Sequence, residues 1–362
     1  MKLWRLEAMR GVAAAWVLLA HAIDHLTNTD TLHFGNWRGL SIYGSIGVSF
    51  FFVLSGFVMI VSHPSGIGRT RDVGRFLWRP FCRIYPFFWL MLAYAAWLYG
   101  PGSWRDLVAW ASLLPIRLDY LLIPAWTLQQ EVCFYLLFAV CLLPRIGRWA
   151  LASWVVAVIL LNNPWPIGWP AGIWGVVTWR GLNAYTYLFF AGMLAGVVLP
   201  RIRAGRPAGV TLCLLGTAIV AGRLAFDDWG RVDGPTYAYV LYGVGFGCII
   251  LGLAALDRSV FALSVRARAV AKAAGVVSYP LYLSHWLTIE TLASYLARSG
   301  AAARIGAFGC FVVLVAVSLF AAAMLAYGVD QPVQGLLRRL PRALARVRLS
   351  GVAQPDAASR VR

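Results

Sequence analysis

Charged residues, and acidic ones above all, are scarce in this chain. Its 362 residues include 14 aspartates and glutamates against 32 lysines and arginines, and these four types make up 13% of the chain, about half their usual share in a soluble protein. Hydrophobic residues make up 60%, and the mean hydropathy is +0.71. This composition excludes a disordered protein. Despite a pI near 10.2, the 17 tryptophans and long apolar runs are not typical of nucleic-acid-binding proteins. We therefore expect an all-α integral membrane protein with the lipid bilayer, and no nucleic acid, as a partner.

Paired cysteines and metal-binding motifs are also missing from the sequence. The six cysteines form no Cys-x-x-Cys pair, and all but Cys82 lie inside apolar runs, where a free thiol acts as a small hydrophobic group. His21 and His25 have the i, i+4 spacing of a metal pair, but no His-Glu-x-x-His motif or third acidic ligand accompanies them. We therefore expect no disulfide framework, no metal site and no permanently bound cofactor.

Ten apolar stretches are long enough to be helices in a membrane: 11–27, 44–62, 78–99, 127–143, 149–161, 185–199, 208–224, 237–256, 275–297 and 305–327. The segment 101–125 holds three prolines and is predicted to be re-entrant or interfacial. With a cytoplasmic N-terminus, alternate segments collect about three quarters of the 32 lysines and arginines, as the positive-inside rule requires. We predict about ten transmembrane helices in one bundle, 1–337, with both termini cytoplasmic, followed by a basic cytoplasmic tail, 338–362.

Ionisable residues inside the apolar stretches are the candidates for chemistry, because each is costly in a membrane unless it has a partner or a task. Glu131, Glu290, His21 and His285 all fall inside predicted helices, and Glu131 lies a little over one turn into its helix. His21 lies about 16 Å beyond Arg10 along a helix axis. An imidazole beside a carboxylate can take a proton from a hydroxyl, which favours a catalytic pair of His21 and Glu131. The alternative is a pair that only ties two helices together.

Two arginines open the third apolar stretch. Arg79 and Arg83 are spaced i, i+4, so they share one helical face, and aromatic residues surround them. The guanidinium fork matches phosphate oxygens, which indicates a site for a phosphorylated ligand arriving from the cytosol. The alternative for each arginine is simple anchoring at the cytoplasmic interface.

Five motifs in order give the chain a family resemblance. They are Arg10 with His21 eleven residues later, Phe-Phe-Phe-x-x-Ser-Gly-Phe at 50–57, Arg79 with Arg83-Ile-Tyr-Pro, Trp-Thr-Leu-x-x-Glu-x-x-Phe-Tyr at 126–135, and Ser-Tyr-Pro-Leu-Tyr-Leu-x-His-Trp at 278–286. Together they resemble the membrane-bound acyltransferase family 3, bacterial O-acyltransferases of surface polysaccharides. The stretch around Glu131 is most similar to the exopolysaccharide-modifying branch. The resemblance runs from about residue 5 to Pro332.

The resemblance implies an acyl-CoA donor, most simply acetyl-CoA, that binds from the cytosol as a co-substrate. It implies that His21 is the catalytic base or transient acyl acceptor, that Arg10 is its companion, and that Glu131 orients or charge-stabilises His21. It also places Arg79 and Arg83 on the CoA side, where we add Tyr85 and Ser55. We assign the acceptor side to His285, Tyr282 and Trp126.

The predicted function is O-acylation of a surface polysaccharide, a lipopolysaccharide or a lipid-linked sugar at the bacterial inner membrane, with polysaccharide assembly proteins as possible partners. The chain departs from the family pattern at Ser49, at Gln129-Gln130 and at Asp330-Gln331-Pro332, which leaves the acceptor open. Two alternatives belong to other classes. One is a multi-span transporter of lipid-linked sugars or small molecules, and the other is a non-enzymatic scaffold.

Overall fold

The computed structural model describes residues 3–28, 44–63, 66–69, 73–116, 119–162, 180–202, 205–225, 236–259, 263–337 and 339. Within these ranges every regular element is a helix. The helices are α1 (Trp4–Asn28), α3 (Gly44–Val61), α4 (Val73–Tyr99), α5 (Trp104–Ser112), α6 (Ala125–Leu142), α7 (Gly147–Leu161), α9 (Tyr185–Val198), η2 (Leu199–Arg201), α10 (Arg206–Ala225), α11 (Thr236–Arg258), α12 (Val265–Arg298), α13 (Ala301–Leu325) and η3 (Ala326–Asp330).

Each of the ten predicted apolar stretches overlaps one of these helices, which confirms the all-α fold class. In the described part of the chain, six helices are long and apolar enough to cross a membrane: α1, α4, α6, α10, α11 and the helix that runs from Ala301 to Leu337. Shorter apolar helices lie at α3, α7 and α9. The helices therefore suit a multi-pass membrane protein. The exact number of crossings and the side on which each terminus lies stay predictions.

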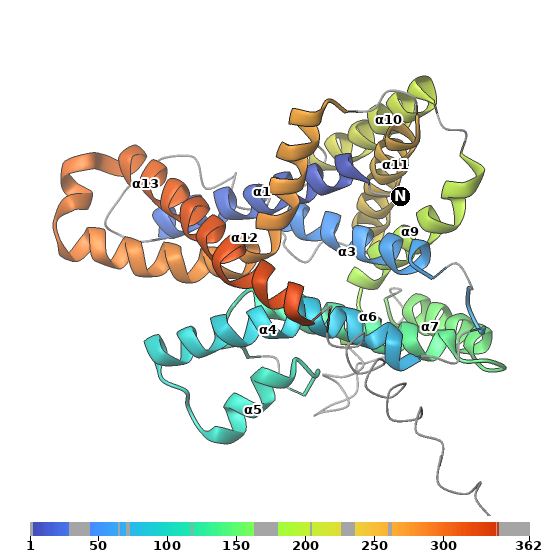
Figure 1. The fold of residues 1–362 in the computed structure, drawn as a ribbon, viewed down its shortest axis with the longest axis horizontal. Coiled ribbons are helices and arrows are strands. Elements are labelled where there is room, and N and C mark those ends of the chain that lie inside the picture. Colours follow the sequence, from blue (N-terminus) through green and yellow to red (C-terminus); the bar gives the residue numbers. More distant parts are fainter. Residues whose placement is uncertain are drawn as a thin grey trace, which may run out of the picture.

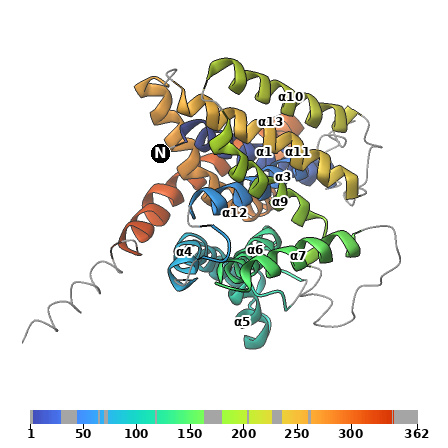
Figure 2. The same cartoon turned by 90° about the vertical axis from the view of Figure 1, so that its right-hand side faces the viewer.

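The helices form two groups that face each other. Figures 1 and 2 show α4, α5, α6 and α7 together on one side, with α1, α3 and α9–α13 on the other. Close packing inside the larger group depends on glycine. A side-chain carbon at Gly192 of α9 would overlap the carbonyl oxygen of Val53 in α3, and one at Gly56 would overlap that of Phe189. Small residues of this kind let membrane helices approach at backbone distance.

Helices α1 and α12 run parallel, and this register matters for the site. A carbon added at Gly11 would lie 2.6 Å from the Cβ of Ala274, and Gly275 has no room for a side chain because Glu7 lies against it. Further along, His21 contacts His285. Because contact positions rise together on the two helices, the helices point the same way. A depth along α1 therefore corresponds to a depth along α12.

The segment predicted as re-entrant or interfacial contains the short helix α5. Ser103 caps its first turn, and Asp106 completes the reciprocal capping box. The C-terminal end of α5 is held against α4, because the hydroxyl of Tyr85 donates to the Ser112 carbonyl at 2.8 Å and the indole of Trp89 donates to the Ala111 carbonyl at 2.9 Å. This segment therefore packs against the side of α4 and α6.

Buried amides fix α6 against its neighbours. Gln129 donates to the Leu114 carbonyl at 2.6 Å and accepts from Tyr120. Gln130 is fully buried and exchanges hydrogen bonds with Asn183 at 3.1 and 3.2 Å. Burying amide groups is costly unless they are paired, and these are paired. The two glutamines that depart from the family pattern therefore have a structural role here.

A break in α13 interrupts the last long helix. Gly306 has φ 68° and ψ 177°, which is outside the helical region and open to glycine but strained for other residues. The helix continues to a π-helical turn at η3 and on to Leu337. The predicted basic tail, 338–362, lies outside the described residues apart from Arg339.

Candidate functional site

A cavity of about 540 Å³, here called the large cavity, opens beside the first turns of α1 and the part of α12 from Lys272 to Tyr279. Its lining carries three cationic side chains, Arg10 of α1, Arg83 of α4 and Lys272 of α12. Two acids also line it. Glu7 is 3.0 Å from Arg10 in an ion pair, and the carboxylate of Asp330 accepts from Gln334 at 2.8 and 3.0 Å. The large cavity thus offers cations drawn from three separate helices.

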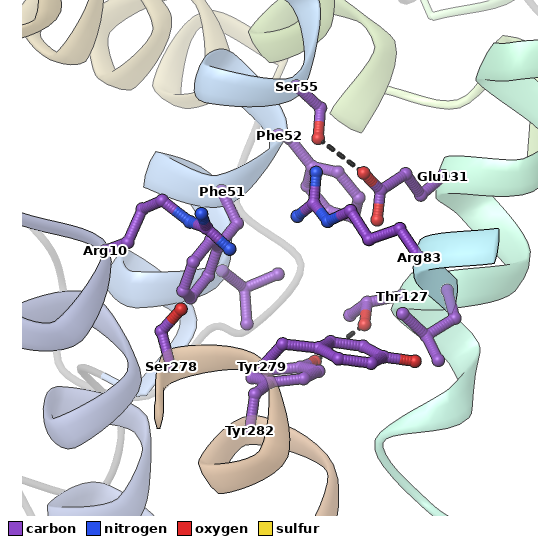
Figure 3. A pocket seen from close by; sticks show the side chains of 12 residues that line it. Arg10, Phe51, Phe52, Ser55, Arg83, Thr127, Glu131, Ser278, Tyr279 and Tyr282 are labelled. Atoms are coloured by element: carbon purple, nitrogen blue, oxygen red, sulfur yellow. Dashed lines mark hydrogen bonds between the residues drawn. The ribbon is translucent and has the colours of Figure 1, made fainter. Parts of the chain in front are cut away.

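A small cavity of about 50 Å³ adjoins the large one and reaches deeper. The two share five lining residues: Arg10, Phe51, Ser55, Arg83 and Tyr279. Figure 3 shows the guanidinium groups of Arg10 and Arg83 pointing into this space from opposite sides, one from each helix group. The small cavity therefore lies between the two groups of helices.

Glu131 of α6 lines the small cavity and is held by two hydroxyls. Ser55 donates to its carboxylate at 2.7 Å, and Tyr135, one turn further along α6, donates at 3.1 Å. Arg83 lies beside it and interacts with it electrostatically (Figure 3). In the described part of the chain His21 is not a hydrogen-bond partner of Glu131. The structure therefore does not provide the direct His21–Glu131 contact that the sequence suggests.

His21 contacts a second histidine instead. The Nδ1 atom of His21 lies 3.2 Å from Nε2 of His285, and the two rings are 5.0 Å apart. His285 is buried, and its Nδ1 lies 3.1 Å from the Leu281 carbonyl oxygen. The same His21 Nδ1 lies 3.0 Å from the Val17 carbonyl oxygen. Both histidines thus bond to the backbone of their own helix and to each other.

These contacts determine where the protons lie. A carbonyl oxygen only accepts, so the Nδ1 of His285 carries a proton and its Nε2, in the neutral ring, is an acceptor. The Nδ1 of His21 therefore carries its proton and shares it between Val17 and His285. The Nε2 of His21 is left with a lone pair. This is the tautomer that a general base needs.

Tyr282 stands between the small cavity and the histidine pair. Its ring lines the cavity and lies 5.8 Å from Phe51 and 5.9 Å from His285. Its hydroxyl is 2.7 Å from that of Thr127, which fixes the ring against α6 (Figure 3). A group in the small cavity is therefore separated from His285 by a single aromatic ring.

The remaining predicted residues lie elsewhere. Arg79 is exposed and lines neither cavity, although it lies one turn before Arg83. Tyr85 stacks on Phe81 and bonds to the α5 segment, so its contacts are structural. Trp126 packs against Tyr185 and Phe52. Of the residues assigned to CoA, the structure therefore brings Arg83 and Ser55 to the cavities, together with Arg10.

Sequence reasoning missed Lys272 and Tyr279 as site residues. Lys272 lies seven residues, two helical turns, before Tyr279, so the two share a face of α12. Tyr279 lines both cavities and donates to the Ile84 carbonyl at 2.6 Å. Their spacing is visible in the sequence, but the sequence alone does not distinguish Lys272 from the other cations at the predicted cytoplasmic interface. Within the described residues, no group of three histidine, cysteine or acidic side chains is placed to hold a metal.

Comparison with known proteins gives one match. The model of acyltransferase family 3, described as an acyltransferase domain, matches residues 3–327. This range contains Arg10, both histidines, Arg83 and Glu131. No curated protein and no solved structure gave a significant match.

Proposed function

Because the chain belongs to acyltransferase family 3, we propose that it transfers an acyl group, taken to be acetyl, from cytosolic acyl-CoA to a hydroxyl group. The acceptor would be a surface polysaccharide, a lipopolysaccharide or a lipid-linked sugar, and the enzyme would act in the bacterial inner membrane. The observation that carries the proposal is the order of groups along α1 and α12: a cation-lined cavity first, and a base-forming histidine pair about ten residues later.

The large cavity suits the phosphates of CoA. Guanidinium groups bind phosphate oxygens in a fork geometry, and a lysine serves as a point charge. Arg10 and Arg83 approach from opposite helix groups, so a phosphorylated ligand would bridge the groups. Glu7 holds one side of Arg10 at 3.0 Å and so fixes the direction of its guanidinium. The acyl-bearing end of the donor would then extend into the small cavity toward Tyr282.

His21 would act as the base. Its Nε2 removes the proton from the acceptor hydroxyl as that oxygen attacks the thioester carbonyl carbon. The new C–O ester bond forms, the C–S bond breaks, and the CoA thiolate leaves and takes up the proton from His21. His285 is a positioning residue in this scheme, because its Nε2 accepts a hydrogen bond from the Nδ1–H of His21 and so stabilises the imidazolium that forms.

A second route uses the same residue as nucleophile. His21 Nε2 would attack the thioester carbon, forming a C–N bond as the C–S bond breaks, and the Nδ1 proton of His21 would pass to the leaving CoA thiolate. The acceptor hydroxyl would then attack the acyl-histidine, so that a C–O ester bond replaces the C–N bond and the hydroxyl proton returns to His21. The two routes differ in one observable, because only the acyl-histidine route binds label to the protein before the acceptor is added.

The test uses inverted membrane vesicles from cells that express the chain, supplied with radiolabelled acetyl-CoA. Label is counted in the protein, lipid-linked and polysaccharide fractions for wild type, His21→Ala and His63→Ala. His63 lies past the end of α3 and lines neither cavity, so it is the matched histidine control. We expect wild type and His63→Ala to label a glycan fraction.

His21→Ala should lose this labelling by about 10²–10⁴-fold, the usual contribution of a general base, while remaining in the membrane at the wild-type level. Equal labelling by wild type and His21→Ala would remove His21 from the chemistry. Absence of label in every sample, with acetyl-CoA and longer acyl-CoA donors alike, would contradict acyl transfer itself.

A further inference from the structure

A third cavity lies beyond the histidine pair and is separate from the large cavity and the small cavity. It has a volume of about 220 Å³ and is lined by α1, α12 and α13. We call it the Glu290 cavity, after the carboxylate that lines it together with His25 and Ser294. One water needs only about 10–15 Å³ of such volume, so this space is too large to be a packing defect filled by one water.

The position of the Glu290 cavity follows from the parallel register of α1 and α12. His25 lies four residues after His21, on the same helical face and about 6 Å further along the axis. Glu290 lies five residues after His285, about 7.5 Å further along α12. The large cavity lies on the opposite side of the pair, at the level of Glu7 and Gly275. The histidine pair is therefore between the large cavity and the Glu290 cavity.

The cavity lies beside the break in α13. Gly306 leaves the helical conformation, and the residues four positions before and after it, Ala302 and Cys310, both line the cavity. A break of this kind changes the path of a helix. The open space beside Glu290 therefore coincides with a change in the path of α13.

The chemistry of the lining differs from that of the large cavity. Glu290 accepts a hydrogen bond from Tyr99 of α4 at 2.6 Å and interacts electrostatically with His25. The remaining walls are apolar, including Leu26, Leu296 and Leu314. Among the residues that the structure describes, no arginine or lysine lines this cavity, so a phosphate group would meet the Glu290 carboxylate without a cation from these residues. A neutral molecule with several hydroxyls fits better, because its hydroxyls can donate to Glu290 and its C–H faces can pack on the leucines.

From these observations we infer that the Glu290 cavity binds the hydroxyl-bearing sugar ring of the acceptor and presents its hydroxyl to His21. The volume, which is below the roughly 300–1,000 Å³ of pockets for drug-sized ligands, limits the occupant to about one ring. This inference rests on the proposed function and adds to it the acceptor class and its site. Donor and acceptor would then approach the histidine pair from opposite directions along α1 and α12.

The test separates acceptor binding from donor binding in purified protein and in membranes. Three variants are compared: Glu290→Gln, which keeps the side-chain shape; Ala293→Phe, which fills the cavity; and Ala303→Phe, which adds the same ring at an exposed position beside the lining residue Ala302. Binding of CoA is measured by calorimetry, and transfer is measured as label from acetyl-CoA in the glycan fraction.

We expect Ala293→Phe and Glu290→Gln to lower transfer at least tenfold while CoA affinity stays within twofold of wild type. Ala303→Phe should match wild type in both measurements. Unchanged CoA affinity also shows that the filled variant is folded. If Ala293→Phe and Glu290→Gln transfer label like wild type, the acceptor does not bind here, although the proposed function stands. If wild-type protein neither binds CoA nor transfers label, the proposed function fails and this inference fails with it.

Discussion

The large cavity and the Glu290 cavity lie on either side of one histidine pair, and their linings differ in charge. The large cavity is about 540 Å³ and carries three cations, Arg10, Arg83 and Lys272, beside two acids, Glu7 and Asp330. The Glu290 cavity is about 220 Å³ and carries a carboxylate and an imidazole. This difference supports our proposal of two ligands, a polyanionic donor and a neutral polyol acceptor. A transporter that moves one solute along one path would need compatible groups at both ends, and these ends are not alike.

After His21→Ala, the largest effect on the histidine pair should come from His285→Phe. This change removes the acceptor for the Nδ1 proton of His21, 3.2 Å away, and frees the His21 ring to turn. We expect the kcat of transfer to fall on the order of 10²-fold, with the KM for acetyl-CoA unchanged. His285→Gln, which places an amide oxygen within reach of His21, should recover part of the rate. A rise in KM with unchanged kcat would show instead that His285 binds a substrate directly.

On the donor side, Arg83→Ala should raise the KM for acetyl-CoA about 10–100-fold, because a hydrogen bond to a charged group contributes about 1.5–3 kcal/mol. Arg79→Ala is the matched control, one turn earlier on α4 but exposed and outside both donor cavities. Initial rates over a range of acetyl-CoA concentrations measure both. Equal increases for the two variants would mean that the arginines act only as interfacial anchors.

Lys272→Ala should have a smaller effect on the same constant, about threefold to fivefold, because Lys272 is exposed and solvent screens its charge. The increase should shrink as the salt concentration rises. An acetyl-CoA analogue that lacks the 3′-phosphate tests which phosphate Lys272 contacts. If Lys272 binds the 3′-phosphate, the KM for this analogue should be the same in wild type and Lys272→Ala. An effect that is independent of salt would contradict a phosphate contact.

The smallest predicted effect concerns Tyr282, whose ring lies between the small cavity and the histidine pair. Tyr282→Phe keeps the ring but removes the 2.7 Å contact with Thr127, and interhelical hydrogen bonds in membranes contribute about 0.6 kcal/mol on average. Transfer should stay within about threefold of wild type. Tyr282→Ala removes the ring itself and should raise hydrolysis of acetyl-CoA without acceptor, measured as free acetate. Unchanged hydrolysis would show that Tyr282 does not separate the donor from water.

The helices could be predicted from the sequence because apolar runs of membrane length are a strong signal, and all ten overlap a helix. Candidate residues such as His21 and Arg83 could be predicted because charge inside an apolar run is costly. Their partners could not. The pairing of His21 with His285 depends on the parallel register of α1 and α12, which close packing at Gly11 and Gly275 determines.

The location of Glu131 illustrates the same limit. Its predicted depth is similar to that of His21 or slightly outward, whereas in the structure its carboxylate accepts hydrogen bonds from Ser55 of α3 and Tyr135 of its own helix. Depth places a residue along the membrane normal only, and the lateral position comes from helix packing. The Glu290 cavity could not be predicted either, because hydropathy gives only the apolar stretch 305–327 and not the backbone break at Gly306, at its beginning.

The central claim is that donor and acceptor reach one histidine pair from opposite directions, and a single titration tests it most directly. Label transferred to the glycan fraction is measured against acetyl-CoA concentration for wild type, Arg83→Ala and Ala293→Phe. Saturating acetyl-CoA should restore the rate of Arg83→Ala, because only donor binding is weakened, and should leave Ala293→Phe at least tenfold below wild type. Restoration of both variants, or of neither, would contradict separate donor and acceptor cavities.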